Sequence, residues 1–231
     1  MRGVETGTLL EEAIADFAEA LRRNPRLDTA WSWRGNARIN LAQLKRSGPD
    51  GSRLRDEAIA DFDESLKLNA DRAENWINRA TTHVDRALDL ERASAAEAMK
   101  AYNLALADFG EVVRRWKGHA EAWLGRGRAW INIARLRRRE ARDATEPLKA
   151  ALADFTEGIR IGATYSEGWE GRGSVRMEMS YQAARTGTDP EPIVRTALAD
   201  FEEGVRRTPT DPHALLGRAT ARGNLGDIAG E

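Results

Sequence analysis

The chain has 231 residues, of which 32% are charged, and 36 Lys and Arg against 37 Asp and Glu leave a formal net charge of −1. This balance provides no bulk attraction to nucleic acid or to an anionic membrane, so we expect neither as a partner. Cysteine is absent, which excludes disulfide scaffolds, thiolate metal sites and cysteine nucleophiles.

A phrase of the form Ala-Ile/Leu-Ala-Asp-Phe recurs along the chain. Its phenylalanines are every Phe in the protein: Phe17, Phe62, Phe109, Phe155 and Phe201. The gaps of 45, 47, 46 and 46 residues indicate an array of about five similar units. In the first copy, apolar residues at spacings of 4, 3 and 4 predict one face of a helix, formed by Leu10, Ile14, Phe17 and Leu21.

A second phrase follows each Phe by 14 residues and also predicts a helix. It begins with a large residue, which is Trp31, Trp76, Trp123, Trp169 or Leu215. Three residues later comes an arginine, followed directly by Gly or Ala. A large residue followed by a small one forms a knob beside a hole for a partner helix, so we expect the four Trp to be buried between helices.

Short turns separate each Phe helix from the next Trp helix and therefore predict antiparallel neighbours. Asn24-Pro25 marks the first of these turns, and Asp211 before Pro212 predicts an N-cap followed by Pro at the first helical position. In chain order, helix-pair units are expected at about residues 8–46, 53–92, 95–142, 146–185 and 190–226. Strand signals are missing, which predicts an all-α solenoid of about ten helices in a single domain, residues 1–231.

The two phrases together resemble the tetratricopeptide repeat in its bacterial Arg-Gly form, five times over. The resemblance implies antiparallel helix pairs that stack into a right-handed superhelix. It also implies a scaffold that holds a peptide or partner protein in a concave groove lined by the Trp helices.

The repeat length departs from the family pattern, because each unit has about 46 residues where the usual repeat has 34. The surplus always falls between a Trp helix and the following Phe helix. The flanks of these segments remain helix formers, so we expect both helices to be extended. Turn residues are expected at Ser47 to Gly51 and at Thr186 to Pro190.

Two charged residues recur once per unit and are expected to be structural. A functional site is normally singular, whereas these residues would form a ladder of ion pairs that fixes the stacking register between packed helices. The aspartates are Asp16, Asp61, Asp108, Asp154 and Asp200, and the arginines are Arg34, Arg79, Arg126, Arg172 and Arg218.

The predicted groove is polar throughout. Residues five and nine positions after each Trp (or Leu215) should point into it: Asn36, Asn40, Thr81, Asp85, Arg128, Asn132, Ser174, Glu178, Thr220 and Asn224. Asn side chains can hold an extended peptide backbone through paired donor and acceptor groups. The alternative interpretation is an ordinary solvated face.

No motif for catalysis, metal ligation or phosphate binding is present, so we expect a non-enzymatic protein without a cofactor or metal. The run Arg135 to Arg142 could contact an acidic partner, but a solvated helix face is the favoured interpretation. No apolar run approaches the roughly 18 residues that span a bilayer, and the N-terminus has no apolar signal core, so the default expectation is a cytoplasmic protein.

The sequence thus favours a scaffold that binds a protein or peptide, and leaves two alternatives open. The array opens with a Phe helix and closes with a Trp-type helix at Leu215 to Leu225, without evident capping helices. A structural subunit that self-assembles head to tail would use these open ends. A regulatory segment of a larger enzyme is the other alternative.

Overall fold

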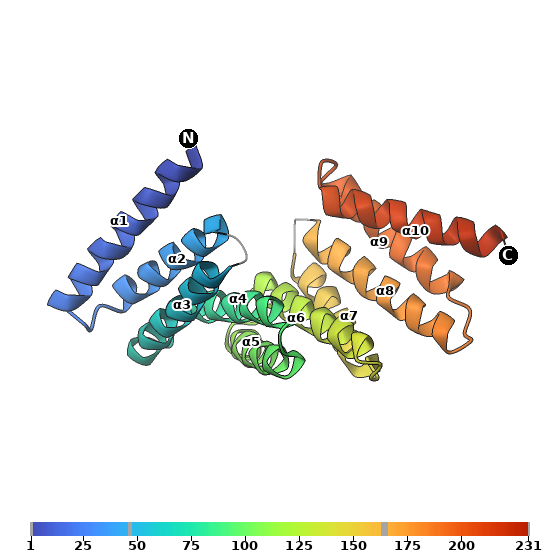
Figure 1. Ribbon diagram of the computed structural model, residues 1–231. Coiled ribbons are helices and arrows are strands. Elements are labelled where there is room, and N and C mark those ends of the chain that lie inside the picture. The colour runs from blue at the N-terminus through green and yellow to red at the C-terminus, as the bar shows by residue number, and fades with distance from the viewer. Residues whose placement is uncertain (1, 46–47, 163–165, 231) are drawn as a thin grey trace. The chain divides into compact units, whose positions relative to one another are not determined.

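The computed structural model describes residues 2–45, 48–162 and 166–230, and this part of the chain contains ten α-helices and no strand. The chain divides into two compact units, residues 1–116 and 117–231 (Figure 1). The first unit holds α1 (Arg2–Arg23), α2 (Asp28–Lys45), α3 (Pro49–Leu68), α4 (Ala73–Leu90) and α5 (Ala95–Arg115). The second holds α6 (Ala120–Arg139), α7 (Thr145–Ile161), α8 (Glu167–Arg185), α9 (Glu191–Arg207) and α10 (Pro212–Gly230).

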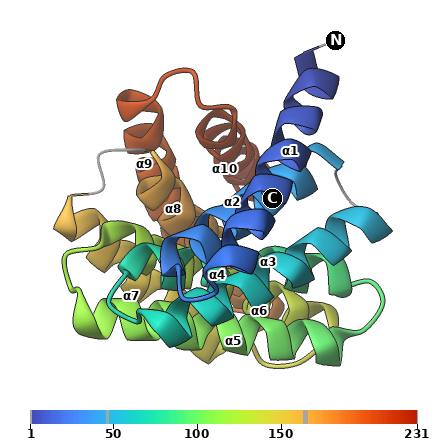
Figure 2. The same ribbon diagram turned by 90° about the vertical axis from the view of Figure 1, so that its left-hand side faces the viewer.

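Consecutive helices within each unit pack side by side and reverse direction at short turns (Figures 1 and 2). Even-numbered helices carry the Trp phrase, and α10 carries Leu215 in its place. Odd-numbered helices carry the Phe phrase. Within each unit the even-numbered helices also contact one another, α2 with α4, α6 with α8, and α8 with α10. They therefore form one layer and the Phe helices the other.

Most of the surplus residues of each repeat lie in helices, as predicted. The helices are 17 to 22 residues long. The predicted turn at Ser47 to Gly51 is wrong in part, because Pro49 opens α3 and Gly51 is a buried residue of that helix. Proline is suited to the first helical position, where no backbone N–H is needed. Arg46 and Ser47 lie outside the described residues.

Helix ends elsewhere follow the sequence signals. Asp211 caps α10, with its side chain accepting a hydrogen bond from the backbone N–H of His213. Gly162 ends α7 with a φ of 113°, a left-handed conformation that favours glycine. The last helix continues to Gly230, beyond the predicted end at Leu225.

Each core is organised around the phenylalanine rings. Phe62, Phe109, Phe155 and Phe201 are at most 2% exposed. A Cβ atom placed on Gly35 would lie 3.0 Å from the Phe62 ring, which shows how closely the ring approaches the preceding Trp helix. Phe17 is only half-buried, because no Trp helix packs ahead of α1 in the described residues.

No helix in the described residues is both long enough and apolar enough to cross a membrane. The same residues contain no cluster of three or more His, Cys, Asp or Glu side chains arranged to hold a metal ion.

Candidate functional site

Four of the recurring arginines lie against the aspartate of the following Phe helix. The Arg Nη2 to Asp Oδ1 distances are 2.7 Å for Arg34–Asp61, 2.6 Å for Arg79–Asp108, 2.6 Å for Arg126–Asp154 and 2.7 Å for Arg172–Asp200. The Arg Nε atoms donate to the same carboxylates, which makes the pairs bidentate. The four aspartates are at most 5% exposed. These enclosed, repeated pairs therefore link each Trp helix to the next Phe helix.

Two further arginines contact the same carboxylates. Arg38 pairs with Asp61 and Arg176 pairs with Asp200, each one helical turn beyond the first arginine. They also donate to a backbone carbonyl of the Phe helix, that of Glu57 for Arg38. Asp61 and Asp200 are thus each held by two guanidinium groups.

The indole of each recurring Trp lies beneath the ladder arginine. The guanidinium carbons are 4.7, 5.0, 4.7 and 4.6 Å from the ring centroids for the pairs Arg34–Trp31, Arg79–Trp76, Arg126–Trp123 and Arg172–Trp169. The prediction that these Trp are buried is wrong, because all four are half-buried. In three of them Nε1 donates to the backbone carbonyl six residues earlier, as in Trp31 to Pro25.

The first aspartate and the last arginine of the recurring set form no ladder pair. Asp16 in α1 is exposed, and Arg218 in α10 is half-buried. Neither forms an ion pair within the described part of the chain. The predicted set of five aspartates and five arginines therefore yields four pairs, with one unmatched residue of each sign.

His83 occupies in α4 the position that Arg38 occupies in α2. Burial lowers the pKa of its imidazole below 6.5, Asp108 opposes this shift and Arg79 adds to it. Asp63 and Asp56 also raise the pKa, so charges of both signs surround the ring.

We expect the first unit to lose stability as the pH falls below about 6.5, because unfolded His83 then binds a proton that the folded protein resists. The contribution of neutral His83 to the free energy of unfolding is fully present above the pKa of the unfolded state. It is lost as the pH falls toward the lower pKa of the folded state. Urea midpoints at about pH 7.5 and about pH 5.5 measure the effect. The difference should shrink in His83→Gln and persist in His119→Gln. An unchanged difference in His83→Gln would contradict it.

The predicted groove residues of the first unit lie on α2 and α4. Asn36 is half-buried and accepts a hydrogen bond from Asn78 of α4 at 2.9 Å, which joins the two Trp helices. Asn40 is exposed, and Thr81 and Asp85 are half-buried. None of these four side chains lines the cavity beside α4 that Arg86, Leu88 and Asp89 border.

In the second unit, a cavity of 340 Å³ opens between α8 and α10. It brings together three predicted groove residues, Ser174, Glu178 and Thr220. Its apolar lining comes from Met177, Tyr181, Leu216 and the edge of Phe201. Of the other predicted residues, Arg128 is exposed and pairs with Glu167, Asn132 is half-buried, and Asn224 lines a separate, mainly apolar recess with Ile228.

Glu178 forms the wall of this groove and is neutralised from α6. Its two carboxylate oxygens lie 2.9 Å from Arg135 Nε and 3.2 Å from Arg138 Nε, and the residue is 8% exposed. The side chains of Arg135 and Arg138 are still 43% exposed, so the solvated face predicted for the run is compatible with this pairing. They fix α6 to α8 across the groove floor.

Glu170 lines the same groove, but its carboxylate differs from that of Glu178 in having no arginine partner in the described residues. Burial raises the pKa of its carboxyl, and the nearby Asp211 raises it further, while His213 opposes the shift. No salt bridge to Glu170 is formed within the described residues. The groove therefore combines a carboxylate without a cation partner, hydroxyl groups and an apolar strip. Leu216, which forms part of that strip, is 66% exposed.

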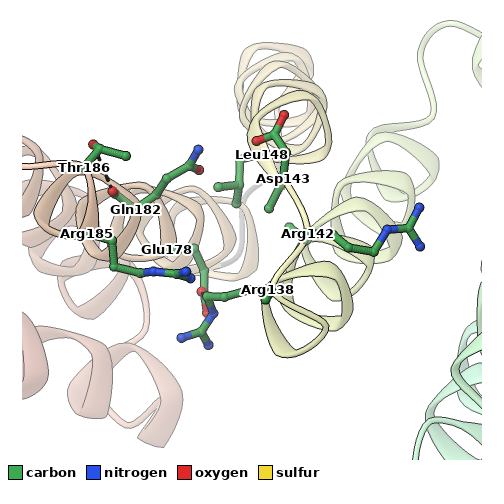
Figure 3. A pocket seen from close by; sticks show the side chains of 11 residues that line it. Arg138, Arg142, Asp143, Leu148, Glu178, Gln182, Arg185 and Thr186 are labelled. Carbon is green, nitrogen blue, oxygen red and sulfur yellow. Dashed lines mark hydrogen bonds and ion pairs between the residues drawn. The ribbon is translucent and has the colours of Figure 1, made fainter.

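A second cavity of 220 Å³ lies on the other side of Glu178 (Figure 3). Its floor is apolar, with Ala134, Ala144 and Leu148, and arginines from α6, α8 and the α6–α7 loop line its rim. Gln182 closes one side by donating to Thr145 Oγ1 at 2.7 Å. In Figure 3 the guanidinium of Arg138 lies beside Glu178, and Glu178 lines both cavities.

The remaining Trp residues differ in exposure. Trp33 in α2 is 59% exposed, whereas Trp116 and Trp130 are half-buried. Trp116 stacks under Arg115, with the guanidinium carbon 4.3 Å from the ring centroid. Of the three, Trp33 alone presents most of its surface to solvent.

Comparison with protein-family models gives no match, and no curated protein matches the sequence. Solved structures do match. YrrB, described as a TPR protein with an unusual peptide-binding site, superposes with a TM-score of 0.58 at 16% identity, over 92% of this chain and 84% of YrrB. MamA superposes with a TM-score of 0.59 at 12% identity, over 88% of this chain and 90% of MamA.

A third similar structure is the human IFIT1 dimer with m7Gppp-AAAA, with a TM-score of 0.59 at 16% identity. The match covers 94% of this chain and 42% of the IFIT1 chain. At these identities the comparisons establish the fold. The chain has the tetratricopeptide-repeat fold, an all-α arrangement of antiparallel helix pairs.

Proposed function

We propose that the protein is a non-enzymatic scaffold that binds a segment of another protein in the groove between α8 and α10. The observation that carries the proposal is the composition of this groove, in which Leu216 and Tyr181 lie beside Ser174, Thr220 and Glu170. Ligand-binding sites combine apolar surface with a few polar groups that fix the orientation of the ligand. An extended peptide presents both kinds of group.

The chemistry of the groove favours a segment with an apolar side chain next to a basic one. Leu216 and Tyr181 are 66% and 37% exposed, and an apolar side chain that covered them would remove this surface from water. Glu170, which has no cation partner in the described residues, would accept a lysine or arginine. The hydroxyls of Ser174 and Thr220 would bond the peptide backbone.

The predicted groove residues of the first unit also remain proposed partner-binding residues. Asn36, Asn40, Thr81 and Asp85 lie on α2 and α4, which are the same kind of helix as α8 and α10. We propose them as separate candidate partner-binding residues of the first unit. The absence of a nucleic-acid partner also remains a proposal, which rests on the net charge of −1.

Selection from a random-peptide library on the immobilised protein, followed by fluorescence anisotropy with the enriched peptides, tests the groove. We expect Leu216→Asp to weaken binding by at least tenfold, which corresponds to about 1.4 kcal/mol. Leu104→Asp is the matched control, because Leu104 is 53% exposed on α5 and lies outside the groove. Peptides that bind wild type and Leu216→Asp equally would overturn the proposal.

A further inference from the structure

One face of α1 is uncovered although its equivalent is buried in every other Phe helix. The alanine four residues before the phenylalanine is 0% exposed in α3, α5, α7 and α9, as Ala58, Ala105, Ala151 and Ala197. The matching Ala13 of α1 is half-buried, and Asp16 is exposed beside it. Leu9 is 59% exposed, whereas Leu54, its equivalent in α3, is 5% exposed. This face is the one that would contact a preceding Trp helix.

The opposite face is uncovered in α10. The small residue after the ladder arginine is buried in α2, α4, α6 and α8, as Gly35, Ala80, Gly127 and Gly173. The matching Ala219 of α10 is exposed. Arg218 has no carboxylate partner in the described residues, and Arg222 reaches only Glu202 of α9 at an exposed position, 2.9 Å away. This face is the one that would contact a following Phe helix.

The two uncovered faces are complementary in charge and in register. Arg218 and Arg222 repeat the spacing of Arg34 with Arg38, and of Arg172 with Arg176, which hold Asp61 and Asp200. Asp16 and Phe17 repeat the sequence Asp-Phe, in which the aspartate binds those arginines in the other copies. Alanine at position 219 is compatible with such packing, because α4 carries the fully buried Ala80 at the same point.

We propose that α10 of one copy of this chain receives α1 of a second copy and forms a fifth rung of the ladder. Asp16 of the second copy would lie between Arg218 and Arg222, and Phe17 would pack on Ala219. The contact is heterologous, so it leaves one α1 face and one α10 face free for further copies. It is separate from the peptide groove and does not depend on the proposed function.

Sedimentation velocity across a concentration series tests this contact. The wild-type weight-average mass should rise above the monomer value of 25.6 kDa as the concentration increases. Asp16→Arg alone and Arg218→Asp alone should both remain at 25.6 kDa, because each places like charges at the contact. Both residues lack ion-pair partners in the described chain, so circular dichroism should report an unchanged fold.

An equimolar mixture of the two variants gives the sharpest result. Asp16→Arg still carries an intact α10 face, and Arg218→Asp still carries an intact α1 face, so the mixture should regain at least dimers of twice 25.6 kDa. Asp50→Arg is the control, because it makes the same charge change at an exposed residue of α3. A wild type that stays monomeric at every concentration overturns the proposal, as does association that survives Asp16→Arg.

Discussion

Replacing Asp61 with alanine is expected to lower the free energy of unfolding of the first unit by about 3–5 kcal/mol, the cost of stranding a buried charge. The Asp61 side chain is 2% exposed, and those of Arg34 and Arg38 are 13% and 15% exposed. Without this carboxylate, Arg34 has no other acidic partner in the described residues. Its side chain is mostly buried, so water solvates the unpaired guanidinium poorly. Urea unfolding monitored by circular dichroism measures the loss.

The control is an ion pair that solvent already screens. Lys67 and Glu64 lie 2.6 Å apart, but their side chains are 67% and 43% exposed. Glu64→Ala should therefore cost less than about 0.5 kcal/mol. Asp61→Asn should cost less than Asp61→Ala, because the amide oxygen still accepts one hydrogen bond. If Asp61→Ala and Glu64→Ala lowered the free energy of unfolding equally, burial of the ladder ion pairs would make no difference to their contribution to stability.

The ladder could be predicted from the sequence because its members recur. An aspartate and an arginine that keep their places in successive phrases meet similar neighbours wherever a Trp helix packs against the next Phe helix, which gives the four observed pairs. The second arginines could not be found in this way. The position seven residues after each Trp or Leu215 is occupied by Arg38, His83, Trp130, Arg176 and Arg222. No periodic signal marks this position, although the same carboxylate lies within reach of it.

The misplacement of the Trp residues has a physical explanation. Recurrence shows that a residue has a fixed environment, but it does not show how deep that environment lies. Trp31 lies in the first turn of α2, where its indole N–H donates to the carbonyl of Pro25 and its ring lies under the Arg34 guanidinium. An indole with an apolar body and a polar edge satisfies both surroundings at half burial.

The groove illustrates the limit of spacing arguments. Helical periodicity placed Ser174 and Glu178 on the same face, and both line the cavity. Which of them is free to bind a ligand depends on a neighbour far away in sequence. Arg135, which neutralises Glu178, is 43 residues earlier and belonged to a run of arginines that suggested a solvated helix. Glu170, four residues before Ser174, was not among the predicted residues because it follows the Trp directly.

Replacing Gly217 with alanine is expected to destabilise the second unit, although alanine is the better helix former. A Cβ atom at Gly217 would lie 2.3 Å from Phe201 Cε1, and one at Gly173 would lie 2.9 Å from the same atom. The ring is 2% exposed and is enclosed from α8 and α10, so it cannot move aside. Overpacking costs about 1–3 kcal/mol, against a gain of about 1 kcal/mol in helix propensity.

The same helix contains the matched control. A Cβ atom placed on Gly223 would meet no packed neighbour within 4 Å, so Gly223→Ala should stabilise the unit by about 0.5–1 kcal/mol through helix propensity alone. The two substitutions are chemically identical, and opposite signs in urea unfolding would isolate the contact with Phe201. In a Phe201→Leu background, Gly217→Ala should lose most of its cost, because the smaller side chain leaves room for the methyl group. A cost that persists in that background would place the strain elsewhere than at the ring.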